Sequence, residues 1–215
     1  MKLIVSDHCP FSMRCILVLM EKNINFDLEV VDLTRKDEFL HKLSPYARVP
    51  VLVHSGRSIY ESSVINEYLE DINPEPALLP ESAYARANAR FWIDYCNTRF
   101  MPAYFNLLKS GPGQARDRLR AELLESLGVI EQAGLSQQGC QDPYWLGETP
   151  GLVDFTFWPF FERFADVEVY RDVEIPANLK HLNAWLGQMR TRSSVRKLSK
   201  TREHYIDYFR PYYAD

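Results

Sequence analysis

Residues 1–72 alternate between short apolar runs and amphipathic stretches, and this alternation constrains the fold more than any other feature of the sequence. Residues 3–5, 26–30, 49–53 and 59–60 have the composition and patterning of strands. Apolar residues at helical spacing follow Pro10 and Glu61, and residues 34–43 form a polar, partly helical stretch. The predicted order is strand-helix-strand-helix-strand-strand-helix, which is typical of an α/β layer.

The second half of the chain shows only helical patterns. The proline-rich segment 73–76 interrupts the alternation and is the best candidate for a linker. Beyond it we predict helices over residues 84–108, 116–133, 154–164 and 177–189, with Pro102 expected to end or bend the first of them. The predicted organisation is an α/β domain over residues 1–75 and an all-helical domain over residues 84–215.

Charge and composition exclude several classes of partner. The 25 basic and 29 acidic side chains leave a net charge of -4, which argues against nucleic acid. The apolar start is too short for a secretory signal, and no stretch approaches the roughly 18 apolar residues of a membrane helix. We therefore expect a cytoplasmic protein that binds neither membrane nor nucleic acid. Its four cysteines contain no C-x-x-C pair, so we expect free thiols and no metal site.

Cys9 is the candidate catalytic residue because it follows a strand and precedes Pro10. Proline is favoured at the first position of a helix, which places Cys9 at the N-cap. The dipole there favours an anion such as a thiolate. Ser12 is placed to donate a hydrogen bond to it, and Arg14 to add positive field. Cys15 lies six helical residues, about 9 Å, further along, which is too far for a disulfide; the site would work as a monothiol.

A plainer interpretation of Cys9 is a buried, inert thiol, since free cysteine is among the most buried residue types. The same interpretation is favoured for the other three cysteines, which lack neighbouring activators: Cys15, Cys96 and Cys140.

Two further motifs are compatible with ligand binding. A cis bond before Pro50 would turn the Val49 backbone outward to pair with an extended ligand, although a trans proline at a strand edge is the commoner arrangement. Glu61 and Ser62 open a helix, whose N-terminus can bind a carboxylate while Glu61 accepts from an ammonium group. Plain helix capping explains this motif equally well from the residues alone.

These motifs, in this order, resemble those of the glutathione transferases, and most closely the omega class, over nearly the whole chain. The first half carries Cys9-Pro10-Phe11-Ser12, Val49-Pro50-Val51-Leu52 and Tyr60-Glu61-Ser62, which are similar to the family's cysteine, cis-proline and γ-glutamyl motifs. The second half carries Leu78-Leu79-Pro80, Trp158-Pro159-Phe160 and Trp185-Leu186, which resemble the omega class more specifically.

The resemblance implies a thioredoxin-like N-terminal domain, an all-α C-terminal domain and a homodimer. It implies that Cys9 forms a mixed disulfide with glutathione, the co-substrate. The resemblance also implies that Val49, held by cis-Pro50, pairs with the cysteinyl part of glutathione, and that Glu61 and Ser62 bind its γ-glutamyl end. Lys36 would lie near the glycyl carboxylate, and Phe11 would also line the glutathione site. Trp185 would line a second pocket for a small hydrophobic or disulfide substrate.

One departure from the family pattern concerns a helix cap. The family often has Ser or Thr three residues before the aspartate of a C-terminal capping box, and here Gly151 precedes Asp154. That puts half of a reciprocal cap in doubt. Met13 likewise stands where many relatives have a polar residue.

The function implied is a glutathione-dependent thiol transferase or reductase acting on disulfides, dehydroascorbate or glutathionyl adducts. An alternative of another class is a non-enzymatic, RNA polymerase-associated protein, because the first half also resembles stringent starvation protein A around Glu61-Ser62 and Asn66-Glu67-Tyr68. The retained Cys9 and the omega-like second half favour the enzyme.

Overall fold

The computed structural model describes residues 1–32, 38–136 and 142–214, with side chains from residue 40 onward after the first gap. They form two compact units, Met1–Leu79 and Pro80–Asp215. Each unit is described by itself below.

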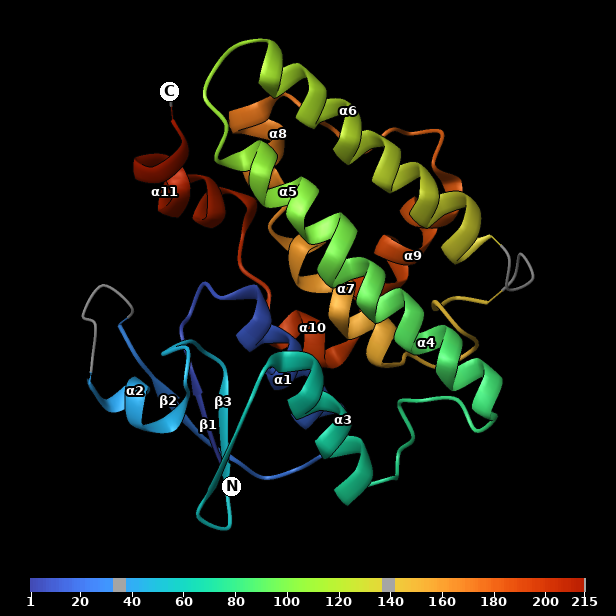
Figure 1. Cartoon of the computed structure of the whole chain (residues 1–215). Coiled ribbons are helices and arrows are strands. Elements are labelled where there is room, and N and C mark those ends of the chain that lie inside the picture. The colour runs from blue at the N-terminus through green and yellow to red at the C-terminus, as the bar shows by residue number, and fades with distance from the viewer. Residues whose placement is uncertain (33–37, 137–141, 215) are drawn as a thin grey trace. The chain divides into compact units, whose positions relative to one another are not determined.

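The first unit is built on a four-stranded mixed sheet of order β2-β1-β3-β4 (Figure 1). Its elements follow the predicted order: β1 (Lys2–Val5), α1 (Pro10–Glu21), β2 (Asp27–Val30), α2 (Glu38–Leu43), β3 (Val51–His54), β4 (Arg57–Tyr60) and α3 (Ser62–Ile72). β1 pairs parallel with β2 and antiparallel with β3, where Ile4 lies opposite Val51. β4 continues the sheet as the antiparallel partner of β3.

Alternation along β1 gives the sheet two apolar faces. Ile4 packs with Val51 and with Leu40 of α2, so α2 covers that face. Leu3 and Val5 point to the opposite face and are fully buried there. Helices α1 and α3 pack on each other and against β1 and β3, which covers that second face. Burial on both faces explains why β1 and β3, which pair at the centre of the sheet, are short apolar runs.

The second unit is all helical within its described residues. Its elements are α4 (Ala83–Tyr95), η1 (Cys96–Phe100), α5 (Met101–Leu108), α6 (Gln114–Val129), η2 (Ile130–Leu135), α7 (Leu152–Glu162), α8 (Ala165–Arg171), α9 (Lys180–Thr191), α10 (Ser193–Leu198) and α11 (Arg202–Tyr213). Each helix predicted from the sequence is present, with shifted ends.

Pro102 neither ends nor sharply bends the helix that contains it. Figure 1 shows α4 and α5 running on as one long rod. The joining segment η1 is π-helical, and the Met101 N–H donates to the Cys96 carbonyl. A proline ring clashes with the carbonyl four residues earlier in a regular α-helix. One wider turn before Pro102 accommodates it, since π-bulges occur as single turns inside α-helices.

Helix α7 is buried on all sides and forms the centre of the second unit. It carries five aromatic side chains that are 4 % exposed or less: Phe155, Phe157, Trp158, Phe160 and Phe161. Trp145 stacks on Phe157 with ring centroids 4.3 Å apart. Such a helix is hydrophobic all round because neighbouring helices surround it.

Asp154 anchors the start of α7. Its carboxylate accepts hydrogen bonds from the Trp145 N–H at 3.0 Å, the Gly151 N–H at 2.8 Å and the Trp185 indole at 2.6 Å. Burial raises the pKa of Asp154 to about 6, against the opposing effect of these donors. The bond from the Gly151 N–H to Asp154 is one half of a reciprocal helix cap. The other half is not made, because Gly151 has no side chain that could accept from the helix N–H groups.

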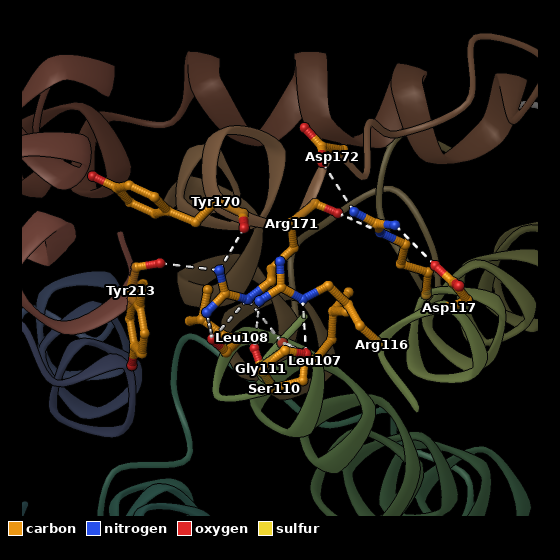
Figure 2. A network of polar contacts seen from close by, with 11 residues as sticks. Leu107, Leu108, Ser110, Gly111, Arg116, Asp117, Tyr170, Arg171, Asp172 and Tyr213 are labelled. Carbon is orange, nitrogen blue, oxygen red and sulfur yellow. Dashed lines mark hydrogen bonds and ion pairs between the residues drawn. The ribbon is translucent and has the colours of Figure 1, made fainter. Parts of the chain in front are cut away.

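Two buried arginines hold the C-terminal end of α5 (Figure 2). Arg171 donates to the carbonyls of Leu107 and Leu108, and also to that of Tyr213 near the end of α11. Arg116 donates to the carbonyl of Ser110 at 2.7 Å, just beyond α5. Carbonyls at a helix C-terminus lack partners within the helix and carry the negative end of its dipole, so guanidinium groups fit there.

We expect Arg171→Met to lower the free energy of unfolding by about 3 kcal/mol, because it leaves several buried carbonyls without donors. Arg190 is exposed and provides a matched control. Arg190→Met should change stability by no more than about 0.5 kcal/mol. Urea denaturation of both variants measures this, and equal stability of the two would contradict the role given to Arg171.

Candidate active site

Cys9 occupies the N-cap of α1, with Pro10 at the first helical position. Its backbone is extended, its N–H donates to the Ser6 carbonyl at 3.0 Å, and its carbonyl accepts from the Met13 N–H at 3.1 Å. The thiol therefore lies at the positive end of the α1 dipole, as the sequence predicted. Cys9 is partly exposed, and its Sγ lies 3.8 Å from the Val49 carbonyl oxygen.

A pocket of about 80 Å³ lies in the first unit beside Val49. Five residues proposed from the sequence line it: Phe11, Val49, Pro50, Glu61 and Ser62. The Val49–Pro50 peptide bond is cis. The structure thus brings together the starts of α1, β3 and α3, which are far apart in the sequence.

The start of α3 forms one wall of this pocket. Glu61 is the N-cap and has a φ of 68°, an unusual conformation for a residue with a side chain. Ser62 is the first helical residue rather than the cap. Strained backbone of this kind costs of order 1–3 kcal/mol and tends to occur at ligand sites. The N–H groups of the first turn can bind an anion.

Arg14 supports this wall from inside the first unit. Its side chain is buried, and its Nη1 donates to the Ser62 hydroxyl at 3.3 Å. Its guanidinium also lies 5.1 Å from the centre of the Phe11 ring. The buried guanidinium thus contacts two residues that line the pocket.

Ser12 does not take the position expected of it. Its hydroxyl accepts a hydrogen bond from the Ser6 N–H at 3.4 Å, within the loop between β1 and α1. Among the described residues the polar contact of the Cys9 thiol is with Val49 instead.

Cys15 lies on the same helix but in the core. It is fully buried, and its Sγ lies 3.7 Å from the Ser62 carbonyl oxygen. Burial raises the pKa of the Cys15 thiol far above its ordinary value, despite the opposing charge of Arg14. Cys96 is also buried and free. Cys140 lies outside the described residues.

Trp185 was expected to line a second-substrate pocket, but the structure places it in the core of the second unit. Its side chain is 3 % exposed and its indole donates to Asp154. Its ring packs edge-on against Trp145 and Phe161. A residue so enclosed stabilises the helical unit. Lys36, expected near a ligand carboxylate, lies outside the described residues.

Three lining residues were not proposed from the sequence: Ser44, Arg48 and Tyr60. Arg48 directly precedes the Val49-Pro50 motif, and Tyr60 directly precedes Glu61-Ser62. Adjacency to Val49-Pro50 was the signal for Arg48, and Tyr60 belongs to the γ-glutamyl motif already quoted; no local pattern marked Ser44. Arg48 brings a guanidinium to the lining of this pocket.

The described residues give no sign of a metal centre or a membrane span. Over the part of the chain that the structure describes, no three histidine, cysteine or acidic side chains cluster so as to hold a metal ion. Nor is any described helix long and apolar enough to cross a membrane.

A thioredoxin-like sheet domain with a cis-proline at the start of β3, followed by an all-helical domain, is the architecture of the glutathione transferases. Comparison with known families agrees. The model for the glutathione S-transferase N-terminal domain matches residues 8–72, and that for the C-terminal domain matches residues 113–188. The chain belongs to the glutathione S-transferase family.

Plant proteins are prominent among its relatives. A probable glutathione S-transferase, parC, of Nicotiana tabacum is 32% identical over 91% of this chain and 88% of that protein. Glutathione S-transferase U28 of Arabidopsis thaliana is 34% identical over 86% of this chain and 82% of that protein. The structure of rice GST1 in complex with glutathione matches with a TM-score of 0.87 and 30% identity, covering 96% of this chain and 93% of that one.

The expectation that the chain is most similar to the omega class is not confirmed. The tau-class transferase of mango, Mangifera indica, superposes with a TM-score of 0.89 at 25% identity over 96% of both chains. The omega 3C transferase of Trametes versicolor gives 0.85 at 26% identity over 95% of this chain and 90% of that one. The tau class is therefore nearer. The resemblance to stringent starvation protein A is not confirmed either.

The two thiols of α1 should react very differently with iodoacetamide. We expect Cys9 to be alkylated at least about tenfold faster than Cys15 in the native protein, because Cys9 is partly exposed and Cys15 is enclosed. Peptide mass spectrometry after timed quenching measures both rates, and urea-unfolded protein serves as the control in which they converge. Comparable native rates would contradict this arrangement.

Proposed function

We propose that this transferase is a glutathione-dependent thiol transferase in which Cys9 forms a mixed disulfide with glutathione. The observation that carries the proposal is the position of the Cys9 thiol, partly exposed at the N-terminus of α1 and 3.8 Å from the Val49 carbonyl. A cysteine at such a position is a nucleophile that can bond to the glutathione sulfur. A hydroxyl would instead stabilise the glutathione thiolate.

Glutathione would bind with its γ-glutamyl end at the start of α3. Its α-carboxylate would accept from the Ser62 hydroxyl and the first-turn N–H groups, and its ammonium would donate to Glu61. The Val49 backbone would pair with the cysteinyl part, next to Pro50. Arg48 offers a cation for the glycyl carboxylate, a role that the sequence alone assigned to Lys36.

The reaction would proceed by two thiol–disulfide exchanges. The Cys9 thiolate attacks the glutathionyl sulfur of a mixed disulfide, a Cys9–glutathione disulfide forms, and the substrate leaves as a thiolate that takes a proton from solvent. The thiolate of a second glutathione then attacks this disulfide, releasing glutathione disulfide and regenerating Cys9. Each turnover reduces one glutathione mixed disulfide, consumes one molecule of free glutathione and releases one glutathione disulfide, whose other half comes from the substrate.

The second thiol would be external, because the described part of the chain offers no cysteine that can pair with Cys9. Cys15, on the same helix, points into the core toward the Ser62 carbonyl. The described cysteines are all free. A monothiol cycle resolved by glutathione follows from this arrangement.

Activity with Cys9→Ala tests the proposal, and Cys15→Ala is the matched control. We expect the wild type to reduce a glutathione mixed disulfide, Cys9→Ala to lose at least about a hundredfold in kcat/KM, and the folded control to stay within a few-fold. Cys9→Ser should lose the reductase activity but conjugate glutathione to an aryl halide better than the wild type does.

Two results would contradict the proposal. One is full reductase activity in Cys9→Ala. The other is a folded wild type that neither reduces the disulfide nor binds glutathione, which would favour the polymerase-associated alternative. We also propose a cytoplasmic homodimer; sedimentation equilibrium of the purified protein tests the dimer.

A further inference from the structure

The last helix of the chain, α11, packs beside α8 in the second unit (Figure 1). Its inner face carries Tyr205 and Phe209, each 7 % exposed. The Arg163 guanidinium lies 4.1 Å from the centre of the Phe209 ring, a cation–π contact. At the other end of α11, Arg171 donates to the Tyr213 carbonyl at 3.0 Å (Figure 2). The helix is therefore held along its inner face and at its C-terminal end.

One carboxyl group holds the chain where it enters α11. Glu162 is the last residue of α7, and its Oε1 accepts from the Lys200 N–H at 3.0 Å, two residues before α11 begins at Arg202. Its Oε2 is buried, and no hydrogen-bond partner for it occurs in the described part of the chain. A buried oxygen without a partner is costly, and it is more costly when it carries a charge. The docked position of α11 therefore favours the neutral, protonated acid.

The groups that face this carboxyl only partly offset its burial. Burial raises the pKa of Glu162 to about 7, while the Lys200 N–H, the Tyr205 hydroxyl and the Lys200 ammonium lower it. The carboxyl thus changes its charge near neutral pH while it is enclosed between α7 and the start of α11.

The other charged groups of α7, α8 and α11 near this point form ion pairs of their own. Arg163 pairs with Asp166 at 3.1 Å, and both side chains are buried. Arg202 pairs with Glu168 at 3.0 Å on the surface. His204 of α11 is exposed. It is the group whose protonation must be separated from that of Glu162 in an experiment.

We propose that Glu162 is a pH-sensitive latch for α11, which stays docked while this carboxyl is protonated and opens when the carboxyl loses its proton. Opening returns the carboxylate to water, where its pKa has the ordinary value of 4.5. The contribution of Glu162 to docking is therefore fully present below that value and is lost as the pH rises to about 7. The latch is independent of the proposed glutathione chemistry.

Hydrogen exchange of the α11 amides, followed by peptide mass spectrometry on the full-length protein between pH 5.5 and 8, tests the latch. Observed rates are divided by the intrinsic rate at each pH to give protection factors. We expect the protection of α11 to fall at least about tenfold across this range in the wild type. Glu162→Gln stays neutral and should keep the same protection at every pH.

Two further variants make the test specific. Glu168→Gln is the matched control, because it removes the exposed ion pair with Arg202. It should lower protection by at most a few-fold and leave the pH dependence unchanged. Lys200→Gln removes an exposed cation that lowers the pKa of Glu162, so its protection should level off at a higher pH than in the wild type.

Three results would overturn the proposal. One is a protection of α11 that does not change with pH in the wild type. Another is the same pH dependence in Glu162→Gln as in the wild type, which would assign the effect to another group such as His204. The third is a Lys200→Gln profile that levels off at the same pH as the wild type.

Discussion

The antiparallel pairing of β1 with β3 is the constraint on which the proposed active site depends. Ile4 lies opposite Val51, so the chain that leaves β1 toward Cys9 passes the chain that enters β3 through Val49 and Pro50. Residues forty positions apart are thereby brought to a 3.8 Å contact between thiol and carbonyl. β4 pairs with β3 and leads directly into α3, which brings Glu61 to the same pocket. The register of these strands thus brings together the Cys9-Pro10, Val49-Pro50 and Glu61-Ser62 motifs.

The same helix holds two thiols in different roles because it is half embedded. Cys9 caps α1 at the protein surface, whereas Cys15 faces inward, where burial disfavours its thiolate. Arg14, between them in sequence, is buried and donates to the Ser62 hydroxyl. The first turns of α1 therefore connect Cys9, the proposed nucleophile, to the start of α3, the proposed anion site.

The sequence predicted what local patterns determine. Alternating apolar runs and the Cys9-Pro10 motif were enough to place every strand, the first helix and its cap. Tertiary contacts determine the features that the sequence did not predict, which are the remaining pocket residues and the burial of Trp185. Ser44 and Arg48 reach the pocket only because β3 folds beside β1, and the burial of Trp185 follows from its bond to Asp154. Helix α8 is too short, at seven residues, for a periodic signal, and η1 has a wider turn than the helical period assumed.

Intact-protein and peptide mass spectrometry after incubation with glutathione disulfide tests the central claim most directly, because it detects the proposed covalent intermediate itself. We expect one glutathionyl group per chain, located on Cys9 and removed by added glutathione. Modification at another cysteine, or none at Cys9 in folded protein, would contradict the assignment of Cys9 as the nucleophile.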